Sequence, residues 1–165
     1  MPLNDLRNTI AKMGQFDWEA EMIGIVSRNT DTIEKMQREQ LYSGVDSNNA
    51  RITLLSHGER YDQYAANTIF GIPYLYKGKI EKGQPIDRIT WSDTGGLYAA
   101  LEAKLNKREV ALTAPGEDEK YSAMMQRSGK ATVGLNEQRR EQFGTDVTLP
   151  EIKTIYKQKT TFEIT

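Results

Sequence analysis

The chain carries the sequence DTGGLYAAL from Asp93 to Leu101, directly after the β-prone tripeptide Ile89-Thr90-Trp91. Its aspartate, threonine and first glycine are residues that form turns and cap helices, so they predict a turn that opens a helix, with Asp93 as the cap. That helix would span Leu97 to Leu105, and a strand over the same residues is the alternative. Four residues would share the apolar face of the helix: Leu97, Ala100, Leu101 and Leu105.

The segments that follow alternate between strand and helix signals. Glu109 to Ala114 alternates apolar and polar residues, which predicts a half-buried strand that ends at Pro115-Gly116. Short helices are expected over Tyr121 to Gln126 and over Glu137 to Phe143, and the side chain of Asn136 can cap the second. This part of the chain therefore mixes helices with at least one strand.

A long amphipathic helix is predicted from Phe16 to Leu41, with Asp17 in position to cap its start. It should end near Ser43-Gly44, where glycine can adopt the left-handed conformation. Residues 44–49 concentrate turn formers, so the chain should reverse before a short strand over Ala50 to Leu55. The apolar face of the helix comprises Trp18, Met22, Ile25, Val26, Ile33, Met36 and Leu41.

The segment from Ser56 to Arg88 lacks sustained helical or strand periodicity and is rich in tyrosine, glycine and proline. It predicts an elaborated loop with one or two short elements, and loops of this length are often functional. Aromatic side chains supply large, rigid contact area, so they are the candidate interface; the alternative is that they hold the loop on its own fold. The candidates are Tyr61, Tyr64, Phe70, Tyr74 and Tyr76, together with Phe162 near the C-terminus.

Residues 1–165 are expected to form one domain, because a chain of this length has room for one ordinary core. Residues 1–15 and 157–165 are candidate flexible arms. A short helix should begin near Pro150, with Ile152, Ile155 and Tyr156 on one face. The β-prone end that follows it could be a free arm or could add a strand to a neighbouring molecule.

Composition excludes several classes of function. The net charge is −1, and a near-neutral chain has no strong basic field for nucleic acid. The absence of cysteine and the presence of a single histidine remove disulfides, thiol nucleophiles and most zinc sites. No apolar run approaches the roughly 20 residues that span a bilayer. A soluble, intracellular protein is therefore expected, without membrane association, cofactor or metal.

The Asp93-Thr94-Gly95 tripeptide also occurs in aspartic proteases, where two carboxylates share one proton. The flanking residues argue against this interpretation, because no aliphatic strand lies on either side of the motif. Gly129 to Gly134 spaces two glycines like a phosphate-binding loop, but Leu135-Asn136 replace the lysine and hydroxyl of that motif. No nucleotide site is predicted.

A polar group at His57, Glu59 and Asp62 could be a general base or a metal site. A lone histidine in a polar loop is more often an ordinary surface residue, and Glu117, Asp118 and Glu119 lack the ligand spacing of a calcium loop. No catalytic residue is therefore predicted, and the chain is not expected to be an enzyme.

Two stretches resemble the head-tail joining, or tail-completion, family of neck proteins in long-tailed bacteriophages. The first is DTGGLYAALEAKLNKREVALTA, which begins at Asp93 and contains Thr94, Gly95 and Leu97 of the family's D-T-G-x-L element. The second is GKATVGLNEQRREQF, in which Gly134-Leu135 precede a helix start. The order of elements is similar as well, although the loop from Ser56 to Arg88 departs from the compact family pattern.

The resemblance implies an α+β domain, in which the long N-terminal helix packs on a small antiparallel sheet and the aromatic-rich loop is an insertion. It further implies a virion protein of the neck or tail, made in the host cytoplasm, that forms a ring with copies of itself. Its other partners would be the portal or connector and the tail proteins, with DNA passing nearby without specific binding. Rings need heterologous contacts, for which the charged helix face, the aromatic loop and the C-terminal arm are candidates.

Two other functions stay open at this level. One is a virion-associated hydrolase that uses Asp93 or the group of His57, Glu59 and Asp62. The other is a soluble adaptor domain that docks through the aromatic loop. On the structural interpretation, Asp93→Asn should be mild and Gly95→Val damaging.

Overall fold

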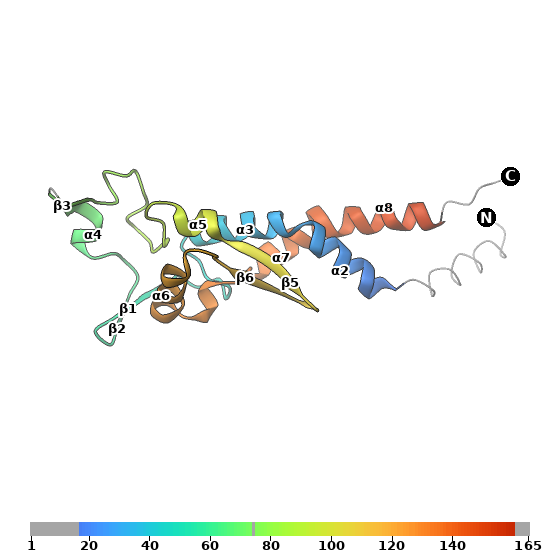
Figure 1. The fold of residues 1–165 in the computed structure, drawn as a ribbon, viewed down its shortest axis with the longest axis horizontal. Coiled ribbons are helices and arrows are strands. Elements are labelled where there is room, and N and C mark those ends of the chain that lie inside the picture. Colours follow the sequence, from blue (N-terminus) through green and yellow to red (C-terminus); the bar gives the residue numbers. More distant parts are fainter. Residues whose placement is uncertain (1–16, 74, 161–165) are drawn as a thin grey trace.

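The computed structural model describes residues 17–73 and 75–160. Helices α3 and α8 lie along the long axis of the molecule, α2 is inclined to it, and a lobe that carries α4 and β3 forms one end (Figure 1). Helices and antiparallel strands are both present, which confirms the α+β class. No helix in the described residues is both long and apolar enough to cross a membrane.

The predicted N-terminal helix is divided in two. Helix α2 spans Trp18–Arg28 and α3 spans Thr30–Tyr42, with Asn29 between them. The Nδ2 of Asn29 donates to the carbonyl of Ile25 at 2.8 Å and to Oε1 of Glu151 at 2.6 Å. This side chain therefore joins the break to a distant part of the chain. The prediction of one continuous helix from Phe16 to Leu41 was therefore wrong.

The predicted ends of this helical segment are confirmed. Oδ1 of Asp17 accepts from the amide of Ala20 at 3.0 Å, as expected of a cap. Ser43 caps the C-terminus of α3, and Gly44 follows with a left-handed φ of 74°. Residues 1–15 lie outside the described residues.

The described strands form three antiparallel pairs: β1 (Leu54–Ser56) with β2 (Glu59–Tyr61), β3 (Gly71–Ile72) with β4 (Tyr76–Lys77), and β5 (Glu102–Asn106) with β6 (Glu109–Thr113). The strand predicted over Ala50 to Leu55 is therefore misplaced, because Arg51 makes only an isolated bridge with Val45 and the ladder with β2 begins at Leu54. The strand predicted over Glu109 to Ala114 is confirmed, but it is mostly exposed, so its half-buried character was predicted wrongly.

The segment after Gly95 corrects the helix predicted over Leu97 to Leu105. Helix α5 covers only Gly96–Ala100, and β5 follows at once. In β5, Ala103 pairs with Leu112 of β6, and its amide donates to Oε1 of Glu34 on α3 at 3.0 Å. The strand alternative thus holds for the second half of the segment, because its backbone groups are paired with β6 and α3.

The lobe at the end of the molecule consists of α4 (Ala66–Phe70) and the β3–β4 pair. Gly78 packs directly against the backbone of Gly71 in this lobe. A Cβ atom at Gly78 would lie only 2.3 Å from the amide nitrogen of Gly71, so the contact requires glycine. The amides of Lys79 and Ile80 donate to the carbonyls of Thr68 and Ile69 at 3.0 and 3.1 Å. The long loop predicted from Ser56 to Arg88 therefore contains more regular structure than expected.

The C-terminal part is largely helical. Helix α6 spans Asp118–Ser128, a 3-10 turn η1 covers Lys130–Thr132, and α7 spans Glu137–Phe143. A π-helical stretch η2 (Gly144–Thr148) joins α7 to α8 (Leu149–Thr160). Asn136 caps α7 as predicted, because its Oδ1 accepts from the amide of Arg139 at 2.9 Å. The β-prone tail was predicted wrongly for residues 157–160, which are helical.

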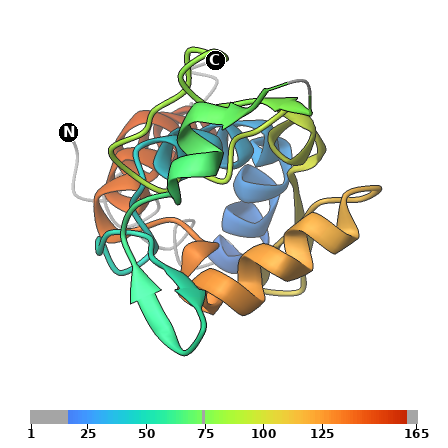
Figure 2. The ribbon, with the colours of Figure 1, turned by 90° about the vertical axis from the view of Figure 1, so that its left-hand side faces the viewer.

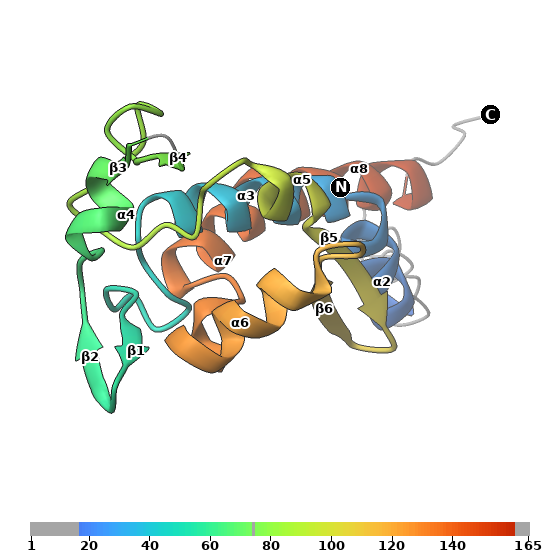
Figure 3. The same cartoon turned by 60° about the vertical axis from the view of Figure 1, so that its left-hand side comes forward.

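Two apolar clusters hold these elements together. The larger contains Leu41 and Met124, both fully buried, and it joins α3 and α6 to the turn around Ile89 and Leu97. The smaller joins α3 and α7 to the β5–β6 hairpin, which lies beside α2 in Figure 3. Its buried members are Ile33, Met36, Ala103 and Phe143.

Candidate functional site

Asp93 does not cap helix α5. The residue at that position is Gly95, with a left-handed φ of 86° and no side-chain cap. The carboxylate of Asp93 pairs with the ammonium of Lys82, and its side chain is 66% exposed. An aspartic protease needs this carboxylate beside a second one, so the ion pair with a lysine does not resemble that chemistry.

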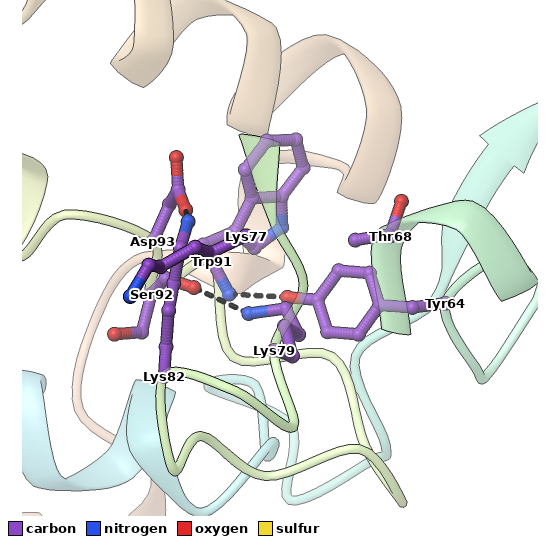
Figure 4. Close-up of a pocket in the computed structure, with 8 residues that line it drawn as sticks. All are labelled: Tyr64, Thr68, Lys77, Lys79, Lys82, Trp91, Ser92 and Asp93. Carbon is purple, nitrogen blue, oxygen red and sulfur yellow. Dashed lines mark hydrogen bonds and ion pairs between the residues drawn. The ribbon is translucent and has the colours of Figure 1, made fainter. Parts of the chain in front are cut away.

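Asp93 lies on the edge of a pocket that collects three lysines (Figure 4). The pocket has a volume of about 350 Å³ and lies where the lobe meets the body of the molecule. Two of its lysines form ion pairs, Lys77 with Glu81 at 3.3 Å and Lys82 with Asp93. The lining residues are Tyr64, Thr68, Lys77, Lys79, Lys82, Trp91, Ser92 and Asp93.

Lys79 is the buried member of this pocket, with 5% of its surface exposed. Its ammonium donates to Oε1 of Gln84 at 3.1 Å and to the carbonyl of Ser92, and it lies 4.3 Å from the centre of the Tyr64 ring. These contacts fasten the lobe to the segment before α5. Sequence periodicity gave no signal for Lys79, because its burial depends on segments that meet only in the fold.

Burial lowers the pKa of Lys79 to about 8, against the opposing effect of the Asp93 carboxylate and with a smaller lowering effect from Lys82. From about pH 8 upward the folded chain releases a proton that the unfolded chain keeps until near 10.5. The free energy of unfolding should therefore rise with pH in this window.

We expect urea denaturation to show that the free energy of unfolding rises by something on the order of 2 kcal/mol between pH 7.5 and 9.5. The same comparison with Lys79→Met should show no such gain, because the titrating group is absent. A rise of equal size in the variant would assign the pH dependence to other groups.

The backbone beside this pocket has an unusual conformation. Trp91 has a left-handed φ of 56°, which is rare for a bulky residue. The hydroxyl oxygen of Tyr64 accepts from the amides of Thr90 and Trp91 at 3.0 and 2.9 Å. The indole of Trp91 donates to Oγ of Ser128 at 2.9 Å. Tyr64, predicted as an interface residue, thus stabilises this turn from within.

Gly95 and Asp93 should differ sharply when substituted. In Gly95→Val a branched side chain must adopt a φ of 86°, which we expect to cost about 2 kcal/mol of stability. Asp93→Asn keeps an acceptor at an exposed ion pair and should cost less than about 1 kcal/mol. Thermal denaturation of both variants checks this order, and an equal loss in the two would contradict it.

His57, Glu59 and Asp62 do not form a joint site. His57 and Gly58 are the turn of the β1–β2 hairpin, with φ values of 52° and 85°. The carboxylate of Glu59 accepts from the hydroxyl of Tyr61 at 2.7 Å, and Asp62 pairs with Arg51 at 3.2 Å. Within residues 17–73 and 75–160, no three His, Cys, Asp or Glu side chains are grouped to hold a metal ion.

The predicted Gly134-Leu135 motif lies against α3 and is held there by two buried glutamines. Oε1 of Gln40 accepts from the amide of Asn136 at 2.8 Å. Nε2 of the same side chain donates to the carbonyl of Gly134, also at 2.8 Å. Oε1 of Gln37 accepts from the amide of Gly134 at 2.8 Å. This glutamine clamp, Gln37 and Gln40, fixes the position of the motif, and the sequence pattern did not single it out.

The predicted aromatic interface divides into exposed and internal parts. Phe70 is 70% exposed and Tyr61 is 45% exposed, whereas Tyr64 is partly buried. Tyr74 and Phe162 lie outside the described residues. The remaining candidate, Tyr76, takes part in the β3–β4 pair.

The most exposed apolar side chains of the described residues belong to the lobe. Leu75, between β3 and β4, is 73% exposed, and Phe70, the last residue of α4, is 70% exposed. Figure 1 shows α4 and β3 at the end of the molecule. Figure 2 shows α4 and the β3–β4 pair end-on, in front of the helices. We call the four residues Phe70, Ile72, Leu75 and Ile80 the apolar tip.

Comparison with protein-family models, with curated proteins and with solved structures finds no match to this chain. No family is assigned. The resemblance to phage neck proteins therefore rests on the two motifs and their order, and the site is interpreted from its geometry.

Proposed function

We propose that this chain is a structural subunit of a bacteriophage particle, of the head-tail connector or tail-completion type. In this role it forms a ring with its own copies and joins the portal or connector to the tail. The protein would be made in the host cytoplasm and would act in the neck or tail of the virion.

The observation that carries this proposal is the apolar tip. Side chains such as Phe70 and Leu75, which are more than two-thirds exposed, mark a surface that another protein covers. The tip lies on a small lobe at one end of an elongated molecule (Figure 1). That arrangement suits a subunit that contacts its neighbouring layer end-on, while its longer sides contact copies within the ring.

The two motifs that resemble neck proteins have structural roles that suit an assembly subunit. Gly95 is the N-cap of α5, which leads into the β5–β6 hairpin, and Gly134 is fixed to α3 by the glutamine clamp. The net charge of −1 suits a subunit that repeats around passing DNA without holding it.

Electron microscopy tests the proposal directly. The purified chain, alone and mixed with connector and tail-tube subunits, should form rings or bind to the connector. Antibody labelling of intact particles should mark the neck or the top of the tail. A chain that stays monomeric and binds neither subunit would reject the proposal, and labelling of a host complex would favour an adaptor domain.

A further inference from the structure

The pocket between the lobe and the body of the molecule carries an excess of positive charge. Its lining contains three ammonium groups, of Lys77, Lys79 and Lys82, and one carboxylate, of Asp93, which leaves a net charge of +2 at neutral pH. The whole chain has a net charge of −1, so this excess is local. A concave surface of one sign of charge concentrates ions of the other sign.

Lys79 is the charge in this pocket that no acid pairs with. The residue is only 5% exposed, and a buried charge in a protein is normally paired with an opposite charge. Its ammonium instead donates to two neutral oxygen atoms, Oε1 of Gln84 and the carbonyl of Ser92. Within residues 17–73 and 75–160 it forms no ion pair with a carboxylate, since Asp93 pairs with Lys82. An anion in the pocket would compensate this charge.

Lys77 and Lys82 have donors left for such an anion. Each forms one ion pair, with Glu81 at 3.3 Å and with Asp93, whereas an ammonium group has three donor protons. The two lysine side chains are 69% and 28% exposed, so a ligand in solution can reach them. In Figure 4 both extend toward the side of the pocket that Ser92 and Asp93 form. The two ammonium groups can therefore contact one anion.

A phosphate group fits this pocket better than a carboxylate does. A phosphate monoester carries a charge of about −1.5 to −2 at pH 7 and has three acceptor oxygens, which matches the excess charge of the lining. A carboxylate has a single charge and two oxygens. The side chains of Thr68 and Ser92 add hydroxyl groups to the lining. The volume of about 350 Å³ leaves room for a small organic group beside the phosphate.

We propose that this pocket binds a small phosphate, either the free ion or a small ester. Lys77 and Lys82 contact the phosphate oxygens, and Lys79 contributes a third positive charge, which is buried. Asp93 opposes binding, because it repels the anion and pairs with Lys82. The inference does not depend on the proposed function, because it requires neither a second copy of the chain nor a connector.

Calorimetric titration of the full chain with inorganic phosphate, at pH 7 and constant ionic strength, tests the site. Lys77→Gln and Lys82→Gln should each weaken binding by about tenfold. Lys153→Gln is the matched control, because Lys153 is an exposed lysine of α8, and it should leave the affinity unchanged. Binding that neither pocket variant weakens, or that the control weakens equally, would overturn the proposal, as would the absence of binding.

Asp93→Asn should increase the affinity for inorganic phosphate by about fivefold. This substitution removes the carboxylate that lines the pocket and releases the ammonium of Lys82 from its ion pair. A purely structural role of the lysines would not produce tighter binding. An affinity that is unchanged or reduced in Asp93→Asn would contradict the proposal.

The contribution of the buried charge is measured with Lys79→Met. This variant should bind inorganic phosphate about fivefold more weakly than the unchanged chain. Thermal denaturation without phosphate shows whether the variant folds, and the substitutions at Lys77 and Lys82 decide the question if it does not. Equal affinity in folded Lys79→Met would overturn the proposal, because the unpaired charge of Lys79 is the observation that carries it.

A second titration with phenyl phosphate distinguishes the free ion from an ester. Tighter binding of phenyl phosphate would identify a small ester as the ligand, because the rings of Tyr64 and Trp91 also line the pocket. Equal or weaker binding would identify the free ion. A short DNA duplex that binds more tightly than both, with the same dependence on Lys77 and Lys82, would overturn the assignment to a small molecule.

Discussion

Gln40→Leu is expected to lower the free energy of unfolding by about 3 kcal/mol. The Gln40 side chain is 1% exposed and bonds two backbone groups at 2.8 Å, the amide of Asn136 and the carbonyl of Gly134. Leucine has a similar volume but bonds neither group, and a buried backbone group without a partner costs roughly 1 to 3 kcal/mol. The loss should exceed that of an ordinary surface substitution several-fold.

Urea denaturation of Gln40→Leu and Gln138→Leu measures this difference. Gln138 is an exposed glutamine in α7, so its replacement should change stability by less than about 0.5 kcal/mol. Similar losses in the two variants would show that the segment around Gly134 is held by its apolar contacts. A large loss in Gln40→Leu alone would show that the clamp positions the motif that resembles neck proteins.

The helices that could be predicted are those with local causes. The apolar spacing that includes Ile33, Met36 and Leu41 placed α3, and the side chains of Asp17 and Asn136 capped helices as expected. The break at Asn29 could not be predicted in this way. One of the two hydrogen-bond partners of the Asn29 side chain there is Glu151, which lies 122 residues further along the chain.

Residues 97–105 show why periodicity failed at the centre of the fold. Leucines at 97, 101 and 105 share one face of a helix and also one face of a strand, since their spacing is a multiple of two. Pairing with β6 and the bond from the amide of Ala103 to Glu34 favour the strand. Of these partners, Glu34 is remote in sequence, whereas β6 follows β5 directly across the turn at residues 107 and 108.

The candidate surfaces were predicted in part. Phe70 was singled out as an aromatic residue in a long loop, and its side chain is exposed, while its role in an interface stays a prediction. Ile72, Leu75 and Ile80 were missed, because single aliphatic residues in a loop carry no periodic signal. Lys79 was missed for a related reason, since only the folded lobe buries it.

Replacing Phe70 and Leu75 together by aspartate is expected to abolish docking through the apolar tip. Both side chains are largely exposed, at 70% and 73%, so the folded chain alone should lose little stability. In a complex the same positions would be covered, and two buried carboxylates without partners would oppose binding strongly. We expect binding to the connector or tail subunit to weaken by about 100-fold or more.

A binding measurement with connector and tail-tube subunits, paired with thermal denaturation, separates docking from folding. Leu149→Asp is the matched control, because Leu149 is also exposed but begins α8, away from the lobe (Figure 1). Weaker binding in the tip variant, with the melting temperature kept and the control unaffected, would identify the tip as the docking surface. Equal weakening in the control would point to a general effect of added charge. If the tip variant binds as well as the unchanged chain, the tip is exposed in the complex as well. The contact would then lie on the long sides of the molecule.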